Sequence, residues 1–145
     1  MRPKDLRVKM DKVVLDANVF VSFLISHQPP ISTILDLWAR GELMVCYSPE
    51  ILDELEAALK YPKIRKLISS LETESLINAI KILGILIIPA KTVEICRDKK
   101  DNKYLEVCLE SASKFLISGD KDLLALGEFE GTKIVSPYDF GQVSG

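Results

Sequence analysis

Five short runs of apolar residues recur along the chain, and each run is almost continuous rather than alternating with polar residues. They are the segments 12–15, 43–47, 85–88, 114–117 and 133–135. Strands that are covered on both faces show this continuous pattern, because neither side of their sheet meets water. The pattern therefore predicts five strands of a buried parallel sheet.

Segments with helical spacing lie between these runs. Apolar residues share one helical face in the segment 31–41. Ser48 and Pro49 form a good N-cap and first-turn pair ahead of a leucine stripe that reaches Leu59. Further helices are expected over about 73–83, over about 102–112 and after residue 120.

Strands that alternate with helices predict βαβ units with right-handed crossovers. We therefore expect a three-layer α/β/α sandwich around a central five-stranded parallel sheet, with strand order 3-2-1-4-5. The 145 residues contain no linker and no internal repeat, which favours a single domain. We place that domain at residues 10–145 and treat residues 1–9 as an N-terminal extension of unknown role.

Composition and charge exclude several classes of protein. A net charge of −2 argues against a protein that coats nucleic acid generally. The longest apolar run, 82–90, contains Gly84 and Pro89 and is too short to cross a bilayer. The charged N-terminus lacks the apolar stretch of a secretory signal, so we expect a cytoplasmic protein with no membrane contact.

Cysteine and histidine offer little chemistry here. The three cysteines have no CxxC spacing, which indicates neither a disulfide framework nor a zinc site. His27 is the only histidine, and it stands in the turn-like segment SHQPP. A mechanism that needs a histidine base has one poor candidate. The carboxylates are therefore the better candidates for functional residues.

Acids follow two of the expected strands directly. Asp16 closes the first strand and precedes Asn18 by two residues, while Asp120 follows the fourth strand and precedes Asp122. In open α/β sheets, ligands bind at the carboxyl ends of strands where the strand order reverses. With the first and fourth strands as neighbours, Asp16 and Asp120 face each other across that crevice. A helix cap is the ordinary role of each acid alone, and the pattern leaves both interpretations open.

More acids could join this pair. Glu54 and Glu56 border opposite sides of the leucine stripe, and periodicity does not choose between them. Asp101 and Asn102 precede a helix, and either could cap it. Oxygen ligands without histidine or cysteine favour Mg²⁺ or Mn²⁺, and clustered carboxylates repel unless a cation neutralises them. Two such ions about 4 Å apart can activate water for phosphodiester cleavage.

Four segments, VVLDANVFVS, SPEILDELEAAL, CRDKKDNKYLEVCLESASKFLISGDKDLL and TKIVSP, together resemble PIN-domain proteins. The resemblance covers residues 12 to about 140 and is greatest to toxin components of toxin–antitoxin systems. It implies a PIN-like fold and a ribonuclease that cleaves single-stranded RNA with Mg²⁺ or Mn²⁺. It also implies an antitoxin protein as partner and a homodimer or higher homo-oligomer.

The resemblance assigns the site residue by residue. The acids it makes both catalytic and metal-binding are Asp16, Glu54, Asp101 and Asp120. The accessory polar positions are Asn18, Asn102 and Asp122. Many relatives carry two consecutive acids where this chain has Asp101 and Asn102, and an asparagine can ligate only through a neutral carbonyl.

Three other functions are weighed against this one. A haloacid-dehalogenase-like phosphatase needs a second acid as proton donor where this chain has Asn18. A receiver domain is weaker, because its acid would follow the third strand. A catalytically silent PIN fold could act as an RNA-binding or scaffold protein, and the presence of all four acids argues against it.

Overall fold

The computed structural model describes residues 11–144, and the extension expected at residues 1–9 lies outside them. The strands are β1 (Asp11–Leu15), β2 (Leu43–Tyr47), β3 (Ile85–Leu86), β4 (Phe115–Ile117), β5 (Glu128–Phe129) and β6 (Thr132–Val135). The helices are α2 (Ala17–Ile25), α3 (Ile31–Ala39), α4 (Pro49–Leu59), α5 (Pro62–Arg65), α6 (Ser70–Leu83), α7 (Asn102–Ser111), α8 (Lys121–Leu126) and α9 (Pro137–Ser144), with a 3-10 turn η1 (Lys99–Asp101) before α7.

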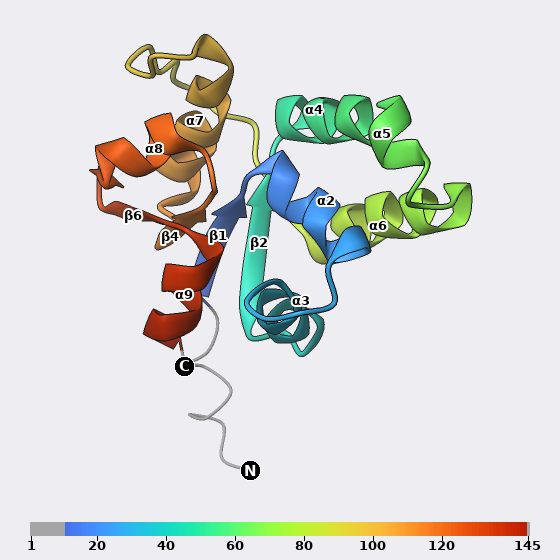
Figure 1. The fold of residues 1–145 in the computed structure, drawn as a ribbon. Helices are drawn as coiled ribbons and strands as arrows, with labels where there is room; N and C mark the ends of the chain where they lie inside the picture. The colour runs from blue at the N-terminus through green and yellow to red at the C-terminus, as the bar shows by residue number, and fades with distance from the viewer. Residues whose placement is uncertain (1–10, 145) are drawn as a thin grey trace.

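The sheet has the order β3-β2-β1-β4-β6-β5. All pairs from β3 to β6 are parallel, so the expected order 3-2-1-4-5 is confirmed with β6 as the fifth parallel strand. Helices α2, α3 and α6 lie on one side of the sheet and α7 and α8 on the other (Figure 1). The three-layer sandwich is therefore confirmed. The order in which the strands are added to the sheet reverses between β1 and β4.

The strand count differs from the expected five. Strand β5 is an added antiparallel edge that pairs with β6. The loop between them holds Glu130 and Gly131, both with positive φ (48° and 88°), as a two-residue hairpin turn requires. A strand of two residues has no measurable periodicity, so the apolar pattern does not reveal it.

Other boundaries shift for local reasons. Strand β3 ends at Leu86 instead of residue 88, because it is an edge strand and Ile88 is exposed. Helix α6 begins at Ser70, three residues before the expected start, where Ser69 and Glu72 form a capping box. Helices α2, α5 and α9 were not expected. Among residues 11–144, no helix is long and apolar enough to cross a bilayer.

The predicted strands form the core together with the inner faces of the helices. Val13, Val14 and Leu15 are fully buried, and Cys46 and Cys108 are buried among them. Strand β1 pairs with β2 on one side and β4 on the other. Its carboxyl end is therefore fixed at the centre of the sheet, where Asp16 follows.

Candidate active site

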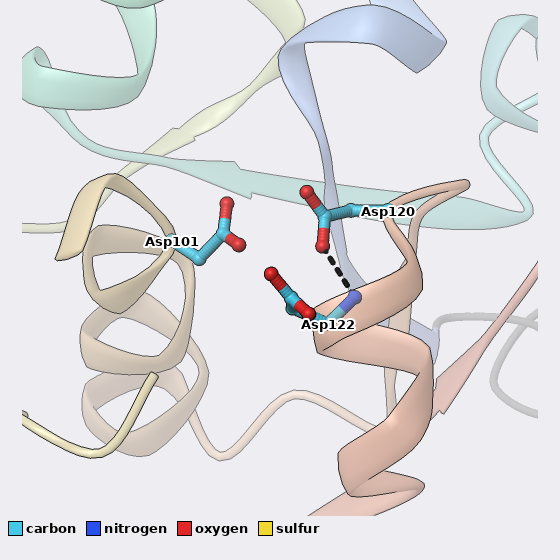
Figure 2. Close-up of side chains that lie close together, drawn as sticks. All are labelled: Asp101, Asp120 and Asp122. Carbon is cyan, nitrogen blue, oxygen red and sulfur yellow. Dashed lines mark hydrogen bonds between the residues drawn. The ribbon is translucent and has the colours of Figure 1, made fainter. Parts of the chain in front are cut away.

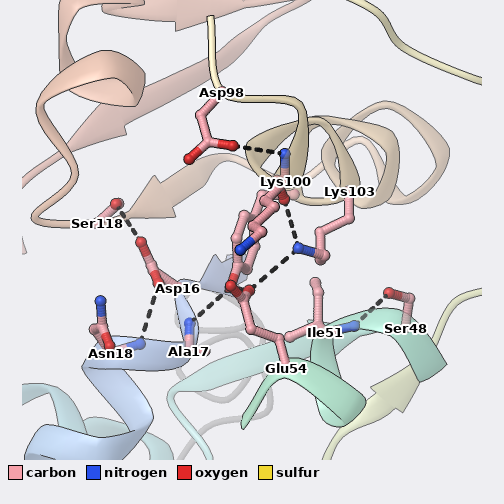
Figure 3. A network of polar contacts seen from close by, with 11 residues as sticks. Asp16, Ala17, Asn18, Ser48, Ile51, Glu54, Asp98, Lys100, Lys103 and Ser118 are labelled. Atoms are coloured by element: carbon pink, nitrogen blue, oxygen red, sulfur yellow. Dashed lines mark hydrogen bonds and ion pairs between the residues drawn. The ribbon is translucent and has the colours of Figure 1, made fainter. Parts of the chain in front are cut away.

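Asp16 stands where β1 becomes α2, and it serves as the N-cap of that helix. Its Oδ1 accepts a hydrogen bond from the Asn18 backbone N–H (3.1 Å), and its Oδ2 accepts one from the Ser118 hydroxyl (2.7 Å), as Figure 3 shows. The residue is only 6% exposed. The capping interpretation is thus correct for Asp16, and both of its oxygens are also held in fixed directions.

Asp120 caps α8 in the same way. Its Oδ1 accepts from the backbone N–H groups of Asp122 (2.8 Å) and Leu123 (3.1 Å). The Asp120 N–H donates to the Ser118 hydroxyl (2.9 Å), which itself donates to Asp16. Ser118 therefore links the carboxyl ends of β1 and β4. At these ends Leu15 pairs with Ile117.

Three carboxylates converge in front of the end of β4. Asp101, Asp120 and Asp122 each offer an oxygen, and these oxygens lie within 4.8 Å of one another (Figure 2). Asp101 is 7% exposed, and its Oδ2 is buried without a hydrogen-bond partner. A buried anionic oxygen with no donor is costly, and a cation would satisfy it.

The neighbours Asp101 and Asn102 point to different partners. The side-chain carbonyl of Asn102 accepts a hydrogen bond from the Cys96 backbone N–H (2.9 Å). That bond closes the loop in front of η1, whereas Asp101 is the residue that meets Asp120 and Asp122. The asparagine thus has a structural partner, and the acid faces the other acids.

Glu54 approaches Asp16 from α4. It lines a cavity of about 580 Å³ together with Asp16 and Asn18. Its Oε1 accepts hydrogen bonds from the Tyr104 hydroxyl and from Lys103 Nζ, the latter at 3.3 Å. Glu56 instead lines a separate groove with residues of α5 and α6. Of the two glutamates that periodicity left open, Glu54 is the one beside Asp16.

Two hydroxyl groups of the site were missed by the sequence interpretation. Ser118 is fully buried between two acids, and Tyr104 is fully buried on the inner face of α7. The Tyr104 hydroxyl accepts from the Ala17 N–H (3.0 Å) and donates to Glu54. A tyrosine on an otherwise apolar helix face is the available signal, because its buried hydroxyl needs a partner.

The acids perturb one another electrostatically. Burial, and then the charges of Asp120, Asp98 and Asp16, raise the pKa of Asp101 to about 7. Burial also raises the pKa of Asp16, and the charges of Glu54 and Asp120 add to this, while hydrogen bonds from Ser118 and Asn18 oppose it. The four acids therefore share one negatively charged crevice.

The donor set indicates which ion the crevice suits. Its ligands are carboxylate oxygens, which Mg²⁺ and Mn²⁺ prefer. The nearby thiol of Cys96 has its pKa raised to about 11 by burial and by Asp101, Asp120 and other acids. That thiol therefore stays protonated at neutral pH in the metal-free protein.

Comparison with known proteins gives three findings. Residues 12–122 match the model of the PIN domain family. An uncharacterized protein of Methanocaldococcus jannaschii is 38% identical over 117 residues, which cover 79% of this chain and 74% of that protein. The crystal structure of VapBC2 from Rickettsia felis, bound to a DNA fragment from its promoter, has a TM-score of 0.58 at 12% identity. That alignment covers 86% of this chain and 98% of the other, and it supports the fold alone.

Proposed function

This chain belongs to the PIN-domain family, and from that membership and the acidic crevice we propose that it is a divalent-metal-dependent endoribonuclease acting on single-stranded RNA. The observations that support the proposal are the cluster of Asp101, Asp120 and Asp122 and the cavity that Asp16 and Glu54 line together. Burial first, and then the charges of neighbouring acids, raise the pKa of Asp101 and of Asp16. Such a cluster is costly to fold without a cation, and its oxygens suit Mg²⁺ or Mn²⁺.

In this proposal Asp101, Asp120 and Asp122 hold one ion, and Asp16 and Glu54 complete the site. Bound divalent ions supply Lewis acidity for the attack of water on a phosphodiester and neutralise the charge that develops on the leaving oxygen. The chain's own residues provide orientation. Ser118 and the Asn18 N–H fix the two oxygens of Asp16, and Tyr104 fixes Glu54.

The substrate groove carries positive charge beside the acids. Lys100 and Lys103 line the cavity that contains Asp16 and Glu54, and they also line a neighbouring cavity of about 730 Å³. The exposed ammonium group of Lys100 would attract the phosphates of a single strand. A water nucleophile leaves the RNA 2′-hydroxyl out of the reaction, so the products carry 5′-phosphate and 3′-hydroxyl ends.

We also propose that the protein is the toxin of a toxin–antitoxin pair in the cytoplasm, where it forms homodimers or higher homo-oligomers. The resemblance of its sequence to toxin components supports an antitoxin protein as its partner. A groove of about 440 Å³ between α2, α3 and α6 is the surface an antitoxin would cover. Its apolar lining includes Phe23, Leu35, Trp38, Leu71, Leu76 and Leu83. Co-expression with the product of the neighbouring gene, followed by co-purification, tests the partner.

The activity is tested with a fluorescent single-stranded RNA. We expect cleavage in Mn²⁺ or Mg²⁺ and no cleavage in excess EDTA. RNA that is bound without being cleaved, at any Mn²⁺ concentration, would instead make the chain a binding protein. Hydrolysis of a small phosphate monoester without RNA cleavage would favour the phosphatase interpretation. Products with 2′,3′-cyclic phosphates would reject water as the nucleophile.

A further inference from the structure

Lys103 is a cation already seated inside the acidic crevice. Its Nζ lies 3.3 Å from Glu54 Oε1 and also donates to the backbone carbonyl of Lys100, as Figure 3 shows. The Lys103 side chain is only 14% exposed, and its Nζ lies 5.4 Å from the centre of the Tyr104 ring. This ammonium is therefore held by a carboxylate, a carbonyl and an aromatic face rather than by solvent.

The carboxylate oxygen that Lys103 contacts cannot easily turn away. Glu54 Oε1 also accepts from the Tyr104 hydroxyl, and that hydroxyl accepts from the Ala17 N–H (3.0 Å). Tyr104 is 1% exposed and anchored in the core. A continuous series of hydrogen bonds thus runs from the Ala17 backbone through the Tyr104 hydroxyl to Glu54. It holds Glu54 Oε1 in place while Lys103 Nζ contacts that oxygen.

A divalent ion at Glu54 would meet this ammonium at close range. A divalent and a monovalent cation about 4 Å apart repel by several kcal/mol at the dielectric of a partly buried site. The ion must displace the ammonium or forgo Oε1. Lysine has a flexible four-carbon stem, and the neighbouring cavity that Lys103 also lines can receive the released group.

We propose that Lys103 is a tethered cation that competes with the divalent ion for Glu54, so that metal loading expels its ammonium into the neighbouring groove. The inference rests on the proposed function for the existence of the ion, and it adds a role for a residue outside the acidic set. Lys103 is here a positioning residue, because it acts through Glu54.

The first test measures Mn²⁺ affinity by isothermal titration calorimetry. Lys103→Met keeps an apolar stem and removes the ammonium. Lys100→Met is the matched control, since it removes a charge from the same rim while Lys100 contacts Lys103 through its backbone carbonyl. We expect Lys103→Met to bind Mn²⁺ about 5- to 10-fold more tightly than wild type, and Lys100→Met to gain less than about 2-fold. Equal gains in both variants, or no gain in Lys103→Met, would overturn the inference.

The second test follows the ammonium directly in the wild-type protein. Lysines are acetylated briefly with an N-hydroxysuccinimide ester in EDTA or in Mn²⁺, and each site is quantified by mass spectrometry. We expect Lys103 to react several-fold faster in Mn²⁺, with the exposed Lys63 unchanged as internal reference. If Mn²⁺ raises the melting temperature while Lys103 reactivity stays constant, the inference is wrong and the proposed function stands. If Mn²⁺ neither stabilises the protein nor binds in calorimetry, both are wrong.

Discussion

Replacing Asp101 by asparagine should stabilise the protein in the absence of divalent ions. The carboxylate of Asp101 is buried, its Oδ2 has no hydrogen-bond partner, and other acids lie within 4.8 Å. Asparagine has nearly the same shape, and it carries no charge. Its amide could also donate a hydrogen bond to the acids beside it, which the aspartate cannot do when ionised.

The magnitude follows from the pKa of Asp101, which is raised from 3.8 to about 7. At about 1.4 kcal/mol for each pH unit, full ionisation at pH 8 costs the folded state at most about 4 kcal/mol. Water and counterions in the open crevice reduce this, so we expect about 1–2 kcal/mol. For a chain of this size, that gain corresponds to a rise in melting temperature of roughly 3 to 8 °C.

The pH dependence has a definite sign. Between pH 4 and 7 the folded protein binds more protons at Asp101 than the unfolded chain does, because its folded pKa is the higher one. The contribution of Asp101 to the stability of the wild type in EDTA therefore falls as the pH rises through this window and levels off above it. Asp101→Asn removes this contribution, so the variant gains nothing at pH 4 and most at pH 8.

The assay is a set of thermal melts in EDTA at pH values from 4 to 8. The control is Asp139→Asn, which removes the same charge from an exposed residue that is not among the acids whose charges raise the pKa of Asp101. The control should shift the melting temperature little at any pH. An Asp101→Asn variant that melts at or below wild type at pH 8 would refute the reasoning.

Further predictions concern activity and metal. Asp16→Asn and Glu54→Gln should each abolish RNA cleavage with an unchanged circular dichroism spectrum, whereas Glu56→Gln should cleave normally; an essential Glu56 would contradict the site. Mn²⁺ at 100 times its dissociation constant should add about 2.7 kcal/mol to wild-type stability and less to Asp120→Asn, measured by denaturant titration. Ser118→Ala removes the hydrogen bond that lowers the pKa of Asp16, so the acid limb of the pH–rate profile should move to higher pH. Tyr104→Phe frees Glu54 and should weaken Mn²⁺ binding about 10-fold in calorimetry without loss of the fold.

Much of the fold could be predicted from the sequence, because the apolar pattern of each segment indicates whether that segment is buried. Continuous apolar runs predicted β1, β2, β4 and β6, and their alternation with helices predicted the parallel order at the centre of the sheet. Asp16 and Asp120 were located by the same logic, since each follows one of these runs directly. A strand as short as β5 has no such pattern, and it depends on a hairpin turn instead.

The partners of each polar side chain were decided only by the tertiary structure. Periodicity placed Glu54 and Glu56 on two sides of one stripe, and the packing of α4 against α2 and α7 put Glu54 beside Asp16. Asp101 and Asn102 are adjacent in sequence, yet one meets Asp120 and the other closes a loop on Cys96. The reason is physical: apolar patterns report how much water a residue meets. A hydrogen bond instead requires two groups from distant positions to meet, and these positions are 50 residues apart for Tyr104 and Glu54 and 102 apart for Ser118 and Asp16.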